Sequence, residues 1–366
     1  MSIVYYGYLV FILAVFTQLA FLLIYFDLFA THKSKRISAE NSAFLPVTVL
    51  IVVKNEKTNL EQLLPLLVNQ DYPGFEIFIM DDHSTDGTDQ WIAAYSKEFP
   101  LLNYSRLTNG QGGKKQALST ALPLISGELI LLTDADCRPH SARWIKQMTN
   151  GITPETVVVL GYSPYLEMSG WLNDVIRLET AYTASLYFSF ALKQHPYMGV
   201  GRNLLYRKQS LIQHFKPENY PGVQSGDDDL TINAMPSHHE IAIQYESDSW
   251  MYSIPKSSWK AWLDQKKRHL STARYYKRGD QTRLMFYYAS LVGSWIMGLT
   301  LGLIYPWMWL IWFLFKGCTY IFLVRPCLVR LGVSFSVLRW LRSEFFYVVA
   351  LIYLFPFSTI KKWDRW

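Results

Sequence analysis

The chain has 366 residues, of which 50% are hydrophobic and 17% are charged, whereas soluble globular domains carry roughly 25% charged residues. The shortfall in charge lies toward the two ends of the chain, which excludes a wholly soluble globular protein and indicates membrane segments. The net charge of +6 does not by itself indicate nucleic acid, and the three cysteines, Cys137, Cys318 and Cys327, are too few and too scattered for a disulfide framework or a zinc site.

An apolar segment opens the chain and predicts an N-terminal transmembrane helix over residues 1–30. Between residues 3 and 30 the only charged residue is Asp27, and about 20 apolar residues suffice to cross a bilayer. A cleaved signal peptide is the alternative, but this run is longer than the roughly 7–15 apolar residues of such a peptide and lacks its basic start and cleavage site. Basic residues within 31–36 follow the span, so we expect the next region to be cytosolic.

Strand and helix patterns alternate between residues 46 and 255, which predicts an α/β domain over residues 31–255. Residues 47–53 are a continuous, largely β-branched run, as in a buried parallel strand. Further strands are expected near 75–80, 101–107 and 128–133. Helices are expected at 60–68, from Ser84 to about residue 99, and from Gly113. Ligands of such sheets bind beyond the carboxyl ends of the strands.

Three acidic clusters lie in order within this domain, and each follows a predicted strand or a tight loop. They are Asp81-Asp82, Asp134-Ala135-Asp136 and Asp227-Asp228-Asp229. Gathered carboxylates need a positive charge among them, and a divalent cation carrying a diphosphate would provide it. Two carboxylates separated by one residue at a strand end can both face one point, where oxygen ligands suit Mg²⁺ or Mn²⁺. Asp134 and Asp136 are therefore the candidate metal ligands, with a solvated turn as the alternative.

The D-x-D cluster and two neighbouring segments resemble the nucleotide-binding half of the family 2 glycosyltransferases, which have the GT-A fold. The segments are Lys54-Asn55-Glu56 after the first strand and Asp81-Asp82-His83-Ser84-Thr85-Asp86 after the second. In that family the acidic residue after the second strand accepts hydrogen bonds from the nucleotide base, and the residue after the first strand contacts base or ribose. The resemblance gives these roles to Asp82 and Glu56, with Lys54, Asp81 and Asp134 beside them in the donor site. The alternative is that Asp82 and Asp86 merely cap a helix.

A glycine-rich segment, Gly110-Gln111-Gly112-Gly113-Lys114-Lys115-Gln116, resembles the family's glycine-lysine segment before a helix. Glycines let the backbone approach a phosphate, and a helix N-terminus attracts anions. The resemblance makes Lys114 the expected diphosphate contact, while Lys115 could simply be solvated. The spacing is not that of a P-loop.

Two later motifs resemble the other half of the family's site. The first, Val200-Gly201-Arg202-Asn203, resembles the G-x-N strand that helps wall the donor sugar, which implies a donor contact by Asn203. The second, Ser225-Gly226-Asp227-Asp228-Asp229-Leu230, resembles the acidic motif that opens a helix and supplies the general base of an inverting transferase. Counting back along the motif favours Asp227 as the base, whereas a literal G-D-D match favours Asp228.

Residues 256–283 form a basic, aromatic segment that we expect to lie on the membrane surface. Nine basic residues stand against two acidic ones, with tryptophans and tyrosines interleaved, and this mixture suits anionic lipid headgroups, with RNA binding as the rival. Within it, Gln265-Lys266-Lys267-Arg268-His269 resembles the family's Q-x-x-R-W motif, which implies that Gln265 and Arg268 contact the acceptor or the diphosphate. His269 stands where processive synthases have a tryptophan that holds the acceptor, which puts processive polymerisation in doubt. The alternative is a basic interfacial helix with no part in the site.

The C-terminal membrane region, residues 284–366, carries two predicted spans, 284–303 and 305–324, and a shorter apolar block at 345–357. The shorter block could be a tilted span, a re-entrant hairpin or an interfacial helix. If it crossed fully, the basic residues at 361, 362 and 365 would lie outside, against the positive-inside tendency. We therefore expect that this block does not fully cross.

The motifs as a set resemble the membrane-anchored subgroup of family 2 glycosyltransferases that includes ceramide glucosyltransferase and hyaluronan synthases. The resemblance implies a GT-A domain with N- and C-terminal transmembrane helices, located at the inner membrane with its active site in the cytosol. It implies an inverting, metal-dependent transfer from a nucleotide-diphosphate sugar, with a UDP-sugar expected, to a lipid or glycan acceptor, and no nucleic-acid partner. Two other functions are possible on the sequence: an inactive membrane-anchored scaffold, which would not hydrolyse sugar nucleotides, and a transporter, which would need more spans.

Overall fold

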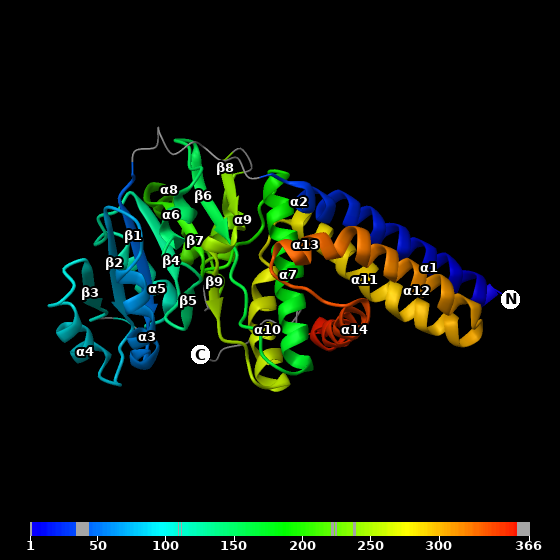
Figure 1. The fold of residues 1–366 in the computed structure, drawn as a ribbon. Helices are drawn as coiled ribbons and strands as arrows, with labels where there is room; N and C mark the ends of the chain where they lie inside the picture. Colours follow the sequence, from blue (N-terminus) through cyan, green and yellow to red (C-terminus); the bar gives the residue numbers. More distant parts are fainter. Residues whose placement is uncertain are drawn as a thin grey trace. The chain divides into compact units, whose positions relative to one another are not determined.

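The fold is that of a computed structural model (Figure 1), which describes residues 2–33, 44–108, 110, 112–220, 223, 225–236 and 239–356. The basic residues at 35, 36, 361, 362 and 365, on which the orientation in the membrane was predicted, lie outside the described residues. The chain divides into two compact units. The sheet unit holds residues 34–166, 191–254 and 364–366, and the helical unit holds residues 1–33, 167–190 and 255–363.

A seven-stranded mixed sheet forms the centre of the sheet unit. Its order is β3 (Leu102–Arg106), β2 (Phe75–Asp81), β1 (Val47–Val53), β4 (Leu129–Thr133), β7 (Leu204–Arg207), β6 (Thr156–Gly161) and β8 (Glu240–Gln244). Strands β3, β2, β1 and β4 are parallel, β7 is antiparallel to β4 and β6, and β6 is parallel to β8. Two short strands, β5 (Cys137–Pro139) and β9 (Met251–Ser253), form a separate antiparallel pair. The first four strands lie where the sequence pattern predicted them, and the α/β class is confirmed.

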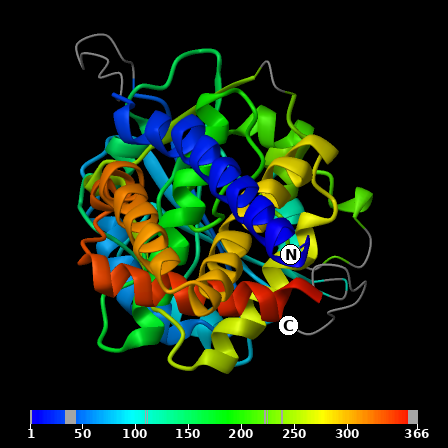
Figure 2. The same ribbon diagram turned by 90° about the vertical axis from the view of Figure 1, so that its right-hand side faces the viewer.

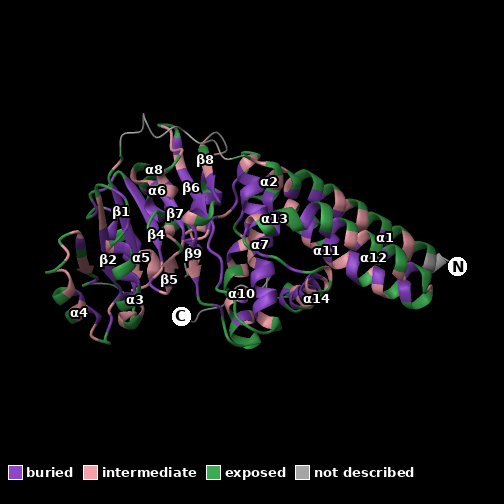
Figure 3. Cartoon of the chain, in the orientation of Figure 1, coloured by how far each residue is buried: buried purple, intermediate pink, exposed green. Residues whose placement is uncertain are grey.

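Helices pack against this sheet. They are α3 (Lys57–Val68), α4 (Thr88–Tyr95), α5 (Lys114–Ala121), α6 (Trp144–Thr149), α8 (Lys208–His214) and α9 (Asp229–Ala234). Alternate residues of β1 share a core with four leucines of α3 and with Trp144 of α6, because alternate strand side chains face one side of a sheet. Figure 3 shows the central strands β1 and β4 as buried. The helix expected from Ser84 to about residue 99 is shorter, since α4 begins at Thr88 and ends at Tyr95.

The helical unit is built from helices of different length and composition. They are α1 (Ser2–Phe21), α2 (Asp27–Thr31), α7 (Trp171–Leu192), α10 (Trp259–Ala273), α11 (Arg278–Ile304), α12 (Trp307–Thr319), α13 (Arg325–Arg330) and α14 (Val337–Leu354). One π-helical turn, Leu22–Phe26, joins α1 to α2, and another, Tyr320–Val324, joins α12 to α13. Three continuous stretches are long and apolar enough to cross a membrane, Tyr5–Thr31, Arg278–Ile304 and Trp307–Arg330. They correspond to the three spans expected from the sequence.

Three features of the helical unit differ from the sequence-based picture. The basic segment 256–283 is divided between α10 and the start of α11. The apolar block at 345–357 lies mostly within a longer helix, α14, which is not among the three candidate spans. Residues 167–190, inside the expected domain 31–255, group with the helical unit because α7 packs and hydrogen-bonds there.

Candidate active site

The loops that follow β1, β2 and β4 meet at one edge of the sheet. These three strands are neighbours and parallel, so their carboxyl ends lie together. The backbone N–H of Asp82 donates to the carbonyl of Val53 at 2.8 Å, which joins the loop after β2 to the end of β1. This edge therefore brings together Lys54, Glu56, Asp81, Asp82, Asp134 and Asp136.

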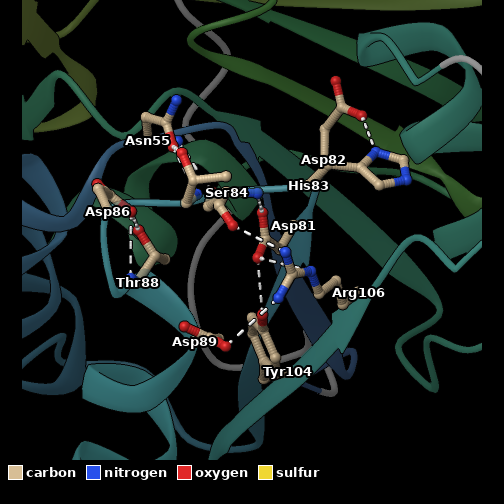
Figure 4. Close-up of polar contacts among 11 residues, drawn as sticks. Asn55, Asp81, Asp82, His83, Ser84, Asp86, Thr88, Asp89, Tyr104 and Arg106 are labelled. Carbon is tan, nitrogen blue, oxygen red and sulfur yellow. Dashed lines mark hydrogen bonds and ion pairs between the residues drawn. The ribbon is translucent and has the colours of Figure 1, made fainter.

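Asp81 is buried and its carboxylate is fully used within the protein. It accepts hydrogen bonds from the backbone N–H of Ser84 at 2.8 Å and from the hydroxyl of Tyr104 at 2.7 Å, and Arg106 Nε lies 3.8 Å away (Figure 4). Burial and the nearby Asp81 carboxylate raise the pKa of Tyr104. Asp81 thus fixes the loop after β2 against β3.

Asp82, by contrast, links two of the predicted segments. Its Oδ2 accepts from the backbone N–H of Gly113 at 2.8 Å and lies 3.7 Å from Lys54 Nζ, while its Oδ1 lies 3.0 Å from His83 Nδ1. Gly112 has a φ of +79°, and a Cβ there would lie 2.4 Å from Asp82 Oδ1. Only glycine fits at this position, because a side chain would be strained by the backbone angle and would collide with the carboxylate.

Asp86 caps two helices, α3 and α4, whereas Asp82 contacts the N-cap residue of a third, Gly113 of α5. Asp86 Oδ2 accepts from the backbone N–H of Lys57 at 3.1 Å, and its Oδ1 accepts from that of Thr88 at 3.1 Å, so it serves the first turns of α3 and α4. Asp82 accepts from neither helix and instead holds the glycine loop.

Glu56 lies close to the D-x-D carboxylates. Its Oε2 accepts from Asn59 Nδ2 at 2.6 Å. Burial raises the pKa of Glu56 against this hydrogen bond, and the negative charges of Asp136 and Asp134 raise it further. The segments after β1 and β4 therefore present carboxylates to one region.

Lys114 lies at the centre of the site, between two acidic clusters. Its Nζ lies 2.9 Å from Asp134 Oδ1 and 3.5 Å from Asp227 Oδ2. Burial opposes the positive charge, but Asp134, Asp227 and Asp228 outweigh it and raise the pKa of Lys114. The D-x-D cluster after β4 and the aspartates before α9 are thereby held together by one ammonium group.

The adjacent aspartates have different partners. Asp228 caps α9, since its Oδ1 accepts from the backbone N–H of Asp229 at 2.9 Å and its Oδ2 from that of Gly201 at 2.6 Å. Burial and the neighbouring Asp227 raise the pKa of Asp228 to about 6, although Lys114 and both N–H groups oppose the shift. Asp227 is buried, and its Oδ2 accepts no hydrogen bond from the described residues, with Lys114 as its ion-pair partner.

Asn203 and Arg202 of the G-x-N motif have different surroundings. The amide of Asn203 is buried and satisfied, because it accepts from Trp144 Nε1 at 2.9 Å and donates to the carbonyls of Tyr162 and Ser249, each at 2.8 Å. Arg202 was not singled out from the sequence. Its Nη1 donates to the hydroxyl of Tyr165 at 2.8 Å, and the nearness of Tyr165, Cys137 and Asp134 raises the pKa of Arg202 against burial.

A second residue missed by the sequence analysis is Tyr206 on β7. Its hydroxyl is buried and has no hydrogen-bond partner among the described residues. Burial raises its pKa, and the charges of Asp228, Asp227 and Asp229 add to the effect. The only sequence signal was its place in the strand that follows Asn203.

Gln265 and Arg268 lie on α10, in the helical unit. Their spacing of three residues puts them on one side of that helix. Their expected contact with acceptor or diphosphate stays a prediction.

The D-x-D residues are suited to a cation that is also held by a ligand. Asp134 and Asp136 are both half-buried and offer oxygen atoms. Among the described residues no group of three or more His, Cys, Asp or Glu side chains could hold a metal alone. The donor set therefore fits Mg²⁺ or Mn²⁺ whose remaining ligands come from a diphosphate or water.

Comparisons with known proteins agree on the class. Residues 48–215 match the model of glycosyl transferase family 2. The chain is 39% identical over 98 residues to a beta-monoglucosyldiacylglycerol synthase of Nostoc sp., covering 26% of this chain and 21% of that protein. It is 29% identical over 117 residues to glycosyltransferase AglE of Haloferax volcanii, covering 31% of this chain and 38% of that protein. The chain thus spans well under half of the length of these curated relatives.

One solved structure is similar over nearly the whole chain. It is a mannosyltransferase from Pyrobaculum calidifontis in complex with GDP-Man and Mn²⁺, with a TM-score of 0.59 and 18% identity, and the match covers 97% of this chain and 99% of that one. At this identity the likeness shows the fold alone, and it confirms the expected GT-A class.

Proposed function

We propose that this chain is a family 2 glycosyltransferase, as the match of residues 48–215 to that family's model supports, and that it transfers a sugar from a nucleotide-diphosphate donor to a lipid or glycan acceptor at a membrane. The observation that carries the proposal is the position of Lys114, within 2.9 Å of Asp134 and 3.5 Å of Asp227. A lysine held between two carboxylates marks the place where an anionic diphosphate and a general base have to come close together.

We assign the donor side to the loops after β1, β2 and β4. Asp82, Glu56 and Lys54 would bind the nucleoside, with Asp81 fixing their loop, and Lys114 would contact the diphosphate. Arg202 would contact the same anion from the side of Asp134. Asn203 would support the wall of the sugar site from behind, because its amide is fully used by protein groups.

Asp134 and Asp136 would hold Mg²⁺ or Mn²⁺. When bound, the cation would neutralise charge on the donor diphosphate and so make it a better leaving group. The oxygen donor set supports this assignment, and the similar mannosyltransferase was solved with Mn²⁺.

Asp227 is the proposed general base, because both oxygens of Asp228 already accept backbone hydrogen bonds. The acceptor oxygen would attack the anomeric carbon from the face opposite the diphosphate, while Asp227 takes the hydroxyl proton. The bond from that carbon to the diphosphate oxygen breaks, and its electron pair stays on the diphosphate. Attack from the opposite face inverts the configuration.

The acceptor is proposed to be a membrane lipid with a free hydroxyl group. The relative from Nostoc is named for a glucosyldiacylglycerol product, and three helices here are long and apolar enough to cross a bilayer. We place the sheet unit on the cytosolic side of the inner membrane, where nucleotide sugars are found, and expect a UDP-sugar as donor.

The test incubates the full-length protein in lipid vesicles with Mn²⁺, diacylglycerol and one radiolabelled donor at a time: UDP-glucose, UDP-N-acetylglucosamine or GDP-mannose. We expect labelled lipid from one donor, and none with Asp227→Asn. If the donor is hydrolysed but no labelled lipid forms, the protein is still an enzyme that uses a sugar nucleotide, but diacylglycerol is not its acceptor. If no donor is consumed, the scaffold function is the better account.

A further inference from the structure

The outward face of α14 is apolar, although three charged residues keep this helix from counting among the candidate spans. Every residue of the helix that counts as exposed is apolar or aromatic: Leu338, Phe345, Val349, Ile352 and Tyr353. Spacings of seven, four and three residues place Leu338, Phe345, Val349 and Ile352 on one stripe. Leu338 is 77% exposed and Val349 is 47% exposed, so the stripe is not covered by the rest of the helical unit.

The inward face of α14 carries the polar groups. Glu344 is buried, and its Oε2 lies 2.9 Å from Lys316 Nζ and accepts from Trp295 Nε1 at 2.8 Å. Its Oε1 accepts from the hydroxyl of Tyr182 at 2.8 Å, and Trp340 Nε1 donates to that hydroxyl at 2.7 Å. A helix on the surface of a soluble protein has the opposite arrangement, with its charges toward water. This arrangement favours an apolar surrounding for the outward face of α14.

The direction of α14 within the helical unit differs from that of the candidate spans. Figure 1 shows α1, α11 and α12 lengthwise and α14 nearly end-on, whereas Figure 2 shows α14 (red) lengthwise and those three helices foreshortened. Because α14 packs against α11 and runs across these helices, it would lie along the membrane plane if they cross the bilayer.

Basic and aromatic residues border the apolar stripe. The guanidinium of Arg342 lies 5.1 Å from the ring of Trp171 and 2.5 Å from Asp174, and Lys267 Nζ lies 5.2 Å from the ring of Tyr353. Pairs of this kind are typical of the headgroup region, where aromatic rings and long basic side chains span the boundary between hydrocarbon and water.

We propose that α14 is an in-plane membrane helix whose stripe, Leu338, Phe345, Val349 and Ile352, contacts lipid acyl chains. The ion pair of Glu344 with Lys316 holds the polar face inward, against the candidate spans. The inference rests on the proposed membrane location of α11 and α12. An in-plane helix of this kind lies at the boundary of headgroups and acyl chains, about 5–10 Å into it.

Spin labelling tests the proposal on the full-length chain. Cys318 is exposed whereas Cys137 and Cys327 are buried, so Cys318→Ser gives a background for single labels. Nitroxides are attached at Leu338→Cys, Val349→Cys and Ile352→Cys in vesicles of phosphatidylcholine and phosphatidylglycerol. Leu310→Cys on α12 is the lipid reference, and Ile212→Cys on α8 of the sheet unit is the matched aqueous reference, since both residues are exposed and apolar. Collision of each label with oxygen, which enriches in hydrocarbon, is compared with collision with a water-soluble nickel chelate.

We expect the oxygen-to-nickel ratio at all three α14 labels to exceed that at Ile212→Cys several-fold, and to be similar at residues 338 and 352. These residues lie 14 positions apart, or about 21 Å along a helix. A ratio that rises or falls steadily from residue 338 to residue 352 would show that the helix is tilted into the bilayer, and would overturn the in-plane position. If the three α14 labels have the low ratio of Ile212→Cys while Leu310→Cys has a high ratio, α14 does not contact lipid, but α12 still lies in the membrane. If Leu310→Cys also resembles Ile212→Cys, the membrane location and this inference both fall. Labels shielded from both reagents would show that a protein, not lipid, covers the stripe.

Discussion

Asp227 and Asp228 are adjacent in the chain, but one carboxylate faces Lys114 and the other accepts two backbone hydrogen bonds. Asp227→Asn should lower sugar transfer by roughly 10²–10⁴-fold, the usual effect of removing a general base, while the donor still binds. Asp228→Asn should change the rate far less and should keep most of the cap of α9, because asparagine caps a helix about as well as aspartate. The measurements are kcat for transfer and thermal unfolding of both variants. A larger rate loss for Asp228→Asn would show that Asp228, and not Asp227, is the general base.

The raised pKa of Asp228 makes stability depend on pH in a defined direction. A carboxyl whose pKa is higher in the folded state contributes stability at low pH, and this contribution is lost as pH rises through the folded pKa of about 6. The wild type should therefore lose melting temperature relative to Asp228→Asn as the pH rises from about 4 to 6, from the unfolded to the folded pKa. Melting curves of the two proteins across this range check the prediction. A difference that is constant with pH would show that Asp228 does not titrate there.

The sequence motifs predicted which residues lie at the candidate site, but they could not predict the partners of each side chain. Asn203 was expected at the donor sugar, and the structure uses its amide to join Trp144, Tyr162 and Ser249. Those partners are far from Asn203 in sequence, so no local pattern indicates them. Arg202 was missed for the same reason, because its position depends on Tyr165.

At the scale of elements, the glycine loop before α5 has a strict steric requirement. Gly112→Ala should weaken donor binding, because the Cβ would collide with Asp82 Oδ1 and displace either the carboxylate or the loop. A left-handed backbone angle costs an alanine about 1–2 kcal/mol in addition. Gly74→Ala is the matched control, since Gly74 has a φ of +71° but no atom within 4 Å of its Cβ position. Both variants should lose stability, and only Gly112→Ala should raise the dissociation constant of the nucleotide sugar. If Gly112→Ala and Gly74→Ala bind the donor equally well, Asp82 is not part of the donor site.

The helices of the helical unit are joined by the buried pair of Lys316 and Glu344. Glu344→Gln leaves Lys316 as an uncompensated buried charge and should destabilise the protein by about 3–5 kcal/mol. The double variant Lys316→Met/Glu344→Gln should recover most of this loss, because no unpaired charge is left. Glu128→Gln, which removes an exposed partner of Arg207, should cost about 0–1 kcal/mol and serves as the control. Thermal unfolding in detergent measures all three. A double variant no better than Glu344→Gln would show that the charge pair is not the cause.

Elements with a strong local pattern were predicted well, and elements that depend on distant partners were not. Val47–Val53 is a β-branched run, and it forms the central parallel strand β1. The insertion of β7 antiparallel between β4 and β6 was not predicted, because pairing across the chain has no local signal. Glu344, which directly precedes the apolar block at 345–357, was likewise not predicted to matter, because its partners lie on three other helices.

At the scale of the whole molecule, the basic segment 256–283 is expected to hold the protein on anionic lipid. Lys266 pairs with Glu179 at 2.5 Å and Lys267 with Asp264 at 3.2 Å, so these two serve the fold. Lys256, Lys260, Lys277 and Arg278 are the exposed lysines and arginines at the two ends of this segment. Their joint replacement by glutamine should weaken transfer to a membrane lipid, because each contributes on the order of 1 kcal/mol near an anionic surface. Hydrolysis of the donor by water should be nearly unchanged. Equal loss of both activities would assign the segment to the donor site instead.

Before residue 357, the chain passes between the sheet unit and the helical unit after residues 33, 166, 190 and 254, and this path limits how the protein can be divided. A single proteolytic cut leaves the units joined by other covalent links. Trimming both ends to residues 34–254 would keep α7 while removing Arg339 and Lys266, the ion-pair partners of its Asp174 and Glu179. Such a fragment would expose the faces of α7 that normally pack inside the helical unit, and it should aggregate. A soluble form of the sheet unit has to be assembled from two pieces of chain, 34–166 and 191–254, with α7 replaced by a short polar linker.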